Sequence, residues 1–84
     1  MIDADYKVKR YISIFRKEDE EYMGKVDLKR FDIEKFRHWF EFKENDALFG
    51  SIELQQKDVE FISNYVGINM DFKLNEYFLE ARSY

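Results

Sequence analysis

The chain contains no cysteine and no proline, and only three glycines among its 84 residues. The absence of cysteine excludes disulfides, thiolate metal sites and a thiol nucleophile. No stretch reaches the ~18 apolar residues that are typical of a membrane-spanning helix. Residues 1–5 also lack the basic and then apolar order of a signal peptide, which favours a cytoplasmic protein.

Aromatic side chains, in contrast, are abundant. Nine phenylalanines, six tyrosines and one tryptophan make up 19% of the residues, and hydrophobic residues reach 45%. Because each aromatic ring buries a large apolar area, a small domain can become stable without disulfides or metal. We therefore predict a single folded domain over residues 1–84.

The charge is distributed unevenly along the chain. The net charge is −4, but residues 1–43 hold 11 basic and 10 acidic groups, whereas residues 44–84 hold 3 basic and 8 acidic groups. Clustered lysine and arginine bind a phosphate backbone, so the acidic half disfavours direct contact with nucleic acid. A basic protein is the better electrostatic match, although an acidic surface can also serve solubility alone.

Alternating side chains predict four strands. Residues 7–16 alternate β-branched and aromatic side chains, and residues 21–28 alternate again after a charged turn at 17–20. This pattern is typical of a β-hairpin. Two further strands are predicted at 51–54 and 76–81.

A first helix is predicted over residues 33–41. Asp32 is the expected N-cap, and Phe31 and Phe36 fit a hydrophobic staple around it. The apolar side chains that repeat at helical spacing, and that we expect to face the core, are Ile33, Phe36, Trp39 and Phe40.

A second helix is predicted over residues 56–66. Gly67 suits the left-handed position that often follows a helix end. Between the first helix and the third strand, residues 42–50 form a polar loop that Leu48 and Phe49 are expected to pin to the core.

The order strand, strand, helix, strand, helix, strand predicts an α+β domain. We expect a two-layer ββαβαβ sandwich, in which two helices cover one face of a four-stranded, mainly antiparallel sheet. The open face would carry apolar side chains among polar ones: Tyr11, Ser13, Phe15, Met23, Lys25 and Glu53. Such a face indicates a contact surface, unless the terminal segment with Tyr84 folds over it.

No arrangement typical of an enzyme is present. The single histidine, His38, falls off the apolar stripe of its helix, and no serine lies in a Gly-x-Ser-x-Gly turn. His38 also lacks companion ligands at the spacing of a zinc site, and the acidic run at 18–21 lacks the spaced ligands of a calcium loop. No Gly-rich phosphate-binding motif occurs. We therefore expect no enzymatic activity, no metal and no cofactor.

Four short segments carry a family resemblance: residues 12–18, 26–28, 48–51 and 76–80. They resemble a family of small bacterial proteins that end in a Tyr-Phe-Leu-Glu signature, here at 77–80. Members of this kind are often immunity-like proteins of polymorphic toxin systems, including contact-dependent growth inhibition. The chain departs from the family pattern at Ala47 and Leu48, where a bulkier pair such as Pro-Met is expected.

The resemblance implies a binding function in the cytoplasm. Such a protein binds the C-terminal domain of its cognate toxin, often a basic nuclease that acts on transfer RNA, and blocks the active site. An aromatic side chain, Tyr11 or Phe15, is expected to anchor the contact. The acids expected to meet the basic cleft of the toxin are Glu44, Asp46, Glu53, Asp58 and Glu60.

Two other functions remain open. The chain could be a homo-oligomeric or adaptor module, for example a homodimer, in which the open face or an edge strand meets a second copy. A regulator that binds a small ligand is the third alternative.

Overall fold

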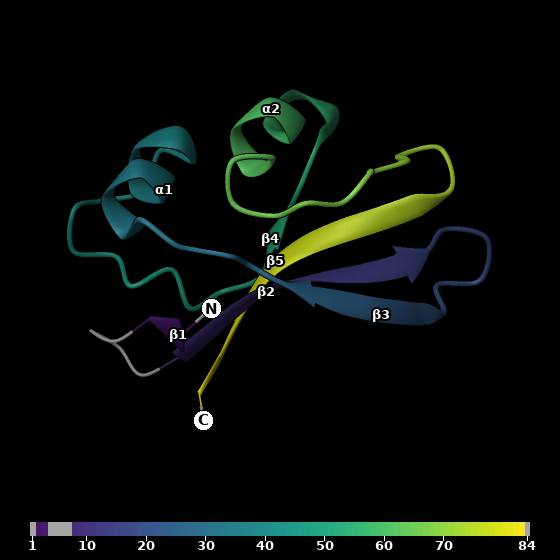
Figure 1. The fold of residues 1–84 in the computed structure, drawn as a ribbon, viewed down its shortest axis with the longest axis horizontal. Coiled ribbons are helices and arrows are strands. Elements are labelled where there is room, and N and C mark those ends of the chain that lie inside the picture. The colour runs from purple at the N-terminus through teal and green to yellow at the C-terminus, as the bar shows by residue number, and fades with distance from the viewer. Residues whose placement is uncertain (1, 4–7, 84) are drawn as a thin grey trace.

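A long antiparallel strand pair forms the centre of the fold (Figure 1). The computed structural model describes residues 2–3 and 8–83. β2 (Val8–Arg16) pairs along its whole length with β5 (Asn75–Ser83). β1 (Ile2–Asp3) and β3 (Tyr22–Asp27) pair with β2, and β4 (Ile52–Glu53) pairs with β5. All four predicted strands are present in an antiparallel sheet, and the two-residue β1 is an additional strand.

Two helical segments cover one side of this sheet (Figure 1). The first is α1 (Ile33–Trp39), and the second is a 3₁₀ turn, η1 (Gln56–Asp58), that continues into α2 (Val59–Ile62). The predicted two-layer α+β architecture is therefore confirmed. No helix of the described residues is long and apolar enough to span a bilayer.

The start of α1 forms as the sequence predicts. The side chain of Asp32 accepts a hydrogen bond from the Lys35 amide at 3.3 Å. The rings of Phe31 and Phe36 pack with their centroids 4.5 Å apart, which confirms the hydrophobic staple.

The end of α1 differs from the prediction. The helix ends at Trp39, because Glu41 adopts a left-handed conformation with φ 61°. The amide of Glu41 donates to the carbonyl of His38, and the amide of Phe42 donates to that of Arg37. The ring of Trp39 stacks on Phe61, but 41% of this residue is exposed, so its predicted place in the core was wrong.

The second helix is shorter and less regular than predicted. It begins as a 3₁₀ turn, and after Ile62 the chain continues as single turns. The carbonyl of Tyr65 accepts from the Lys29 amide at 2.7 Å, so it is bonded to the chain that leaves β3. Gly67 is not left-handed, which contradicts the prediction; among the described glycines only Gly24 has a positive φ, of 132°.

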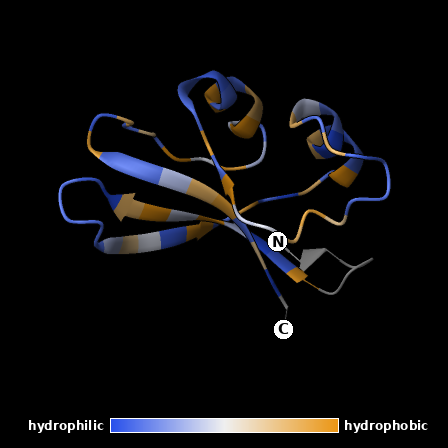
Figure 2. Cartoon of the chain, turned by 180° about the vertical axis from the view of Figure 1, so that it is seen from behind, coloured by the Kyte–Doolittle hydropathy of each residue, from blue (hydrophilic) through white to orange (hydrophobic). Residues whose placement is uncertain are grey.

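The core lies between the helices and the covered face of the sheet. Phe36 and Ile62 bring one fully buried side chain from each helix onto Ile12 of β2 and Leu79 of β5. Figure 2 shows the same organisation by hydropathy: the loop between β2 and β3 is hydrophilic, whereas hydrophobic residues recur along strands and helices. The other fully or mostly buried members of the cluster are Leu28, Leu48, Leu54, Tyr65, Val66 and Tyr77.

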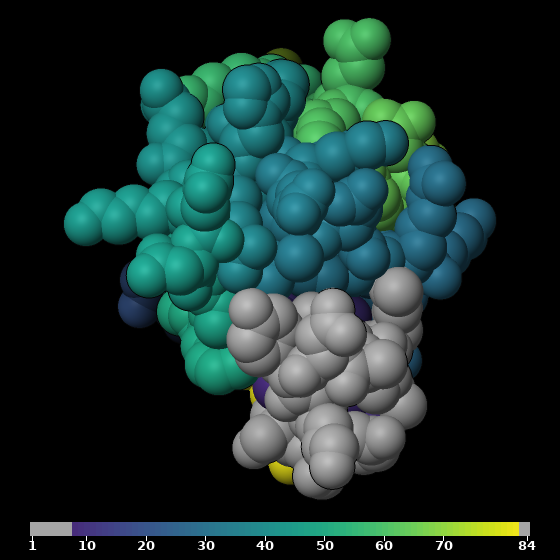
Figure 3. All heavy atoms as spheres, turned by 90° about the vertical axis from the view of Figure 1, so that its left-hand side faces the viewer, coloured from purple at the N-terminus to yellow at the C-terminus, as the bar shows by residue number. Residues whose placement is uncertain are grey.

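The loop between α1 and β4 is held by a buried arginine. The guanidinium of Arg10 donates to the carbonyls of Ala47 and Leu48, and Leu48 is buried as predicted. Phe49 is 53% exposed, which contradicts its predicted role in pinning this loop to the core. Figure 3 shows that α1 and this loop occupy the same end of the molecule.

Candidate protein-interaction surface

A β-bulge shapes the open face of the sheet. The register between β2 and β3 shifts after Ile14, which lies opposite Gly24, so that Phe15 lies opposite Tyr22. The intervening Met23 is the extra residue of the bulge. Tyr22 therefore joins the open face and packs edge-on against Phe15, with ring centroids 5.5 Å apart. Simple alternation of side chains along the strand would put Tyr22 on the same covered face as Val26. This expectation is wrong, because the extra residue of the bulge moves Tyr22 to the open face.

β5 brings acidic and aromatic side chains to the same face. Its residues alternate: Tyr77 and Leu79 are buried in the core, whereas Glu76, Phe78 and Glu80 point the other way. The β2 partners of these three residues on the open face are, in order, Phe15, Ser13 and Tyr11. Ser13, opposite Phe78, is buried at 6% exposure.

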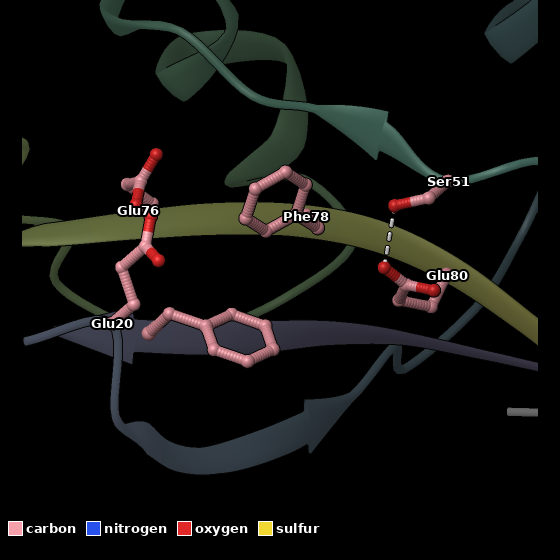
Figure 4. Close-up of a pocket in the computed structure, with 6 residues that line it drawn as sticks. Glu20, Ser51, Glu76, Phe78 and Glu80 are labelled. Atoms are coloured by element: carbon pink, nitrogen blue, oxygen red, sulfur yellow. Dashed lines mark hydrogen bonds between the residues drawn. The ribbon is translucent and has the colours of Figure 1, made fainter. Parts of the chain in front are cut away.

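A hollow of about 420 Å³ opens on this face (Figure 4). In Figure 4, Glu20 and Glu76 lie at one end, Ser51 and Glu80 at the other, and Phe78 between them. Phe15 and Phe78 contact each other edge to face, with ring centroids 5.7 Å apart. We call this site the aromatic–acidic hollow; its lining residues are Phe15, Glu20, Ser51, Glu76, Phe78 and Glu80.

The carboxylates of the hollow have no cationic partner among the described residues. The ion pairs that the described residues form lie outside the hollow, and they join Arg16 to Asp19 and Glu21, and Lys25 to Asp27. The hydrogen bond from Arg16 lowers the pKa of Asp19 to about 2, so these charges are committed to the hairpin turn. The hollow therefore gathers three carboxylates without a direct ion pair around two aromatic rings.

Three of the seven partner-binding residues predicted from the sequence lie on this open face. Phe15 lines the hollow, and Glu53 lies opposite Phe78 on β4. Tyr11 lies on the same face but is covered by a cation, since the ammonium of Lys25 is 4.9 Å from its ring centroid.

The other predicted acids do not join this surface. Glu44 and Asp46 belong to the loop that follows α1, at the opposite end of the long axis from the β2–β3 turn (Figure 1). The Asp46 carboxylate accepts from the Leu48 amide at 2.7 Å, and Glu60 is exposed on α2, on the helical side.

Asp58 is an internal structural group. It is 3% exposed, and its two oxygens accept hydrogen bonds from the indole of Trp39 at 2.9 Å and the amide of Gln55 at 2.7 Å. A carboxylate bonded in this way is not available to a partner, so Asp58 does not belong to the interaction surface.

Sequence reasoning missed five residues of the hollow: Glu20, Ser51, Glu76, Phe78 and Glu80. The alternation of Glu76, Phe78 and Glu80 along one strand was a usable signal, because it places all three on one face. The contributions of Glu20 and Ser51 depend on how the turn and the loop fold, and no local pattern indicates them.

Family comparison covers nearly the whole chain. Residues 9–80 match the family described as a domain of unknown function, DUF7683. The chain belongs to this family. The matched part of the DUF7683 domain contains every residue that lines the aromatic–acidic hollow. Comparison with curated proteins finds no match.

Proposed function

We propose that this DUF7683 domain is an immunity protein, which binds a cognate toxin domain in the bacterial cytoplasm and blocks its active site. The observation that carries the proposal is the aromatic–acidic hollow on the open face of the sheet. Exposed carboxylates around aromatic rings suit a basic protein surface, such as the substrate cleft of a nuclease. The resemblance of residues 77–80 to the immunity-like signature supports a toxin as that partner.

Charge and rings would contribute differently to such a complex. Negative charge on the open face accelerates encounter with a basic partner and makes the association rate sensitive to salt. Buried aromatic rings supply the anchors that slow dissociation. The expected contact centres on Phe15 and Phe78, with Glu53, Glu76 and Glu80 around them.

The test is co-purification with the C-terminal domain encoded immediately upstream of this chain, which the proposal requires to be a basic toxin domain. We expect a stoichiometric complex at low salt, slower association at high salt, and restored growth of cells that express the toxin domain. The matched variants are Glu76→Gln on the open face and Glu60→Gln on the helical side. Only Glu76→Gln is expected to slow association. Absence of a complex at low salt, with both proteins folded, contradicts the proposal.

The free edge of β3 favours one alternative function. Within the described residues β3 pairs only with β2, so its outer backbone groups are open to a strand from a second copy. Sedimentation across a wide concentration range separates the two proposals. A mass that doubles with concentration, together with no toxin complex, favours a homodimeric module.

A further inference from the structure

The aromatic–acidic hollow has the chemistry of a cation site. We infer that it receives the guanidinium of a single arginine side chain from the bound partner. This inference rests on the proposed function, because it takes the arginine from the basic protein that the open face binds.

The two rings of the hollow suit a cation. Cations are attracted to the face of an aromatic ring, and arginine stacks on such faces most readily. This chain uses the same contact internally: Lys25 lies over Tyr11, Arg10 over Phe31 and Arg30 over Tyr65. Within the described part of the chain, no cation lies over Phe15 or Phe78. The faces of these two rings therefore carry no cation from this chain, and both rings line the hollow beside its carboxylates.

The carboxylates select the shape of that cation. Glu20 and Glu76 lie together at one end of the hollow, and Glu80 lies at the other end (Figure 4). The hydroxyl of Ser51 donates to Oε1 of Glu80 at 2.6 Å, which holds that carboxylate in one orientation. A planar guanidinium can lie along an aromatic ring and direct its N–H groups to carboxylates at its edges. The ammonium of lysine is not planar and cannot direct paired N–H groups to carboxylates in this way.

The surroundings suit the aliphatic part of an arginine. Tyr22 packs edge-on against Phe15 and is exposed, and so is Met23, the next residue along β3. They provide an apolar surface along which three methylene groups can pack while the charged head enters the hollow. The site therefore matches the whole side chain and not only its charge.

The experiment titrates the full chain, labelled with ¹⁵N, with three short peptides that differ at one central residue. The peptides carry arginine, lysine or citrulline, which keeps the planar shape of arginine without its charge. We expect the arginine peptide to shift the amide signals of Glu76, Phe78 and Glu80. The lysine peptide should bind more weakly, and the citrulline peptide should cause no shifts.

Two variants test the site itself. Glu76→Gln removes a charge-assisted hydrogen bond and should weaken arginine binding about tenfold. Phe78→Leu keeps an apolar side chain but removes the aromatic ring, and should weaken binding as well. Glu60→Gln, on the helical side, is the control and should leave binding unchanged.

The outcomes separate this inference from the proposed function. If the toxin domain forms its complex but the arginine peptide shifts no signals of the hollow, the arginine inference is overturned and the immunity function stands. Equal binding of the lysine peptide also overturns it. If the arginine peptide binds in the hollow but no toxin complex forms, the cation site stands and the immunity function fails.

Discussion

Arg10 and Asp58 are the two charged side chains that lie inside the protein among the described residues. Each is bonded to groups that are far away in sequence: Arg10 to the carbonyls of Ala47 and Leu48, and Asp58 to the indole of Trp39. Buried charges are tolerated only where polar partners replace water. At the scale of single residues, these two groups therefore hold loops and helices together.

Removing the Asp58 carboxylate should destabilise the fold. Asp58→Ala leaves the Trp39 indole and the Gln55 amide without their acceptor, at a cost of about 1–3 kcal/mol in the free energy of unfolding. Asp58→Asn keeps one acceptor oxygen and should lose less. Urea denaturation followed by Trp39 fluorescence measures both.

The matched control for Asp58 is Glu60→Ala, an exposed acid two residues further along. It should change the free energy of unfolding by no more than about 0.5 kcal/mol. Equal midpoints for the Asp58 and Glu60 variants would show that the buried hydrogen bonds contribute nothing. The sequence could not separate these two acids, because both belong to the same acidic half of the chain. Only the folded structure shows that the Trp39 indole bonds to Asp58 and not to Glu60.

The C-terminal end of α1 has the pattern of a Schellman motif. Its two hydrogen bonds join Glu41 to His38 and Phe42 to Arg37, and Glu41 takes the left-handed position that glycine usually fills. A non-glycine residue is strained in this conformation. A glutamate there also places negative charge at the negative end of the helix dipole.

At the scale of elements, Glu41→Gly should therefore stabilise the protein. We expect a gain of up to about 1 kcal/mol, because relief of the left-handed strain outweighs the added flexibility of the unfolded chain. Glu41→Gln removes only the charge and should give a smaller gain. Comparing the melting temperatures of the two variants separates the effect of backbone strain from the effect of charge. A destabilised Glu41→Gly protein would contradict a strained left-handed conformation at Glu41.

The elements were predictable where a local pattern determines them. The cap at Asp32 and the Phe31–Phe36 staple follow from residues that are adjacent in sequence, and both formed as predicted. The end of α1 was not predicted, because a glutamate and not a glycine takes the left-handed position at Glu41. The shape of α2 was not predicted either, because the turns that follow it are bonded to a distant segment through the hydrogen bond from Lys29 to Tyr65. Of the residues that line the hollow, only Phe15 was predicted to bind a partner, and the open face was predicted as the contact surface.

The whole molecule depends on β5. Leu79 lies opposite Ile12 of β2 on one side and Ile52 of β4 on the other, so one side chain connects both halves of the sheet to the core. The overall architecture was predictable because the alternation along each strand already separates a core face from an open face. The bulge at Met23 was not, since nothing in the alternation marks the extra residue.

Leu79→Ala should cost about 2–5 kcal/mol, which is typical for a leucine truncated in a packed core. Since small domains have total stabilities of only about 5–15 kcal/mol, much of the protein should unfold at moderate temperature. Leu74→Ala is the control, because Leu74 is 63% exposed on the loop before β5. Circular dichroism during heating compares the two; equal melting temperatures would contradict the central role of β5.

The position of β5 also has a consequence for biosynthesis. Both strands that it joins, β2 and β4, precede it in the chain, so the ribosome must release residues 75–83 before the sheet can close. Until then the inner edge of β2 has no partner, and a nascent chain carries an open strand edge. The same nine residues supply Glu76, Phe78 and Glu80. The hollow therefore cannot capture a partner until residues 75–83 have left the ribosome and paired with β2 and β4.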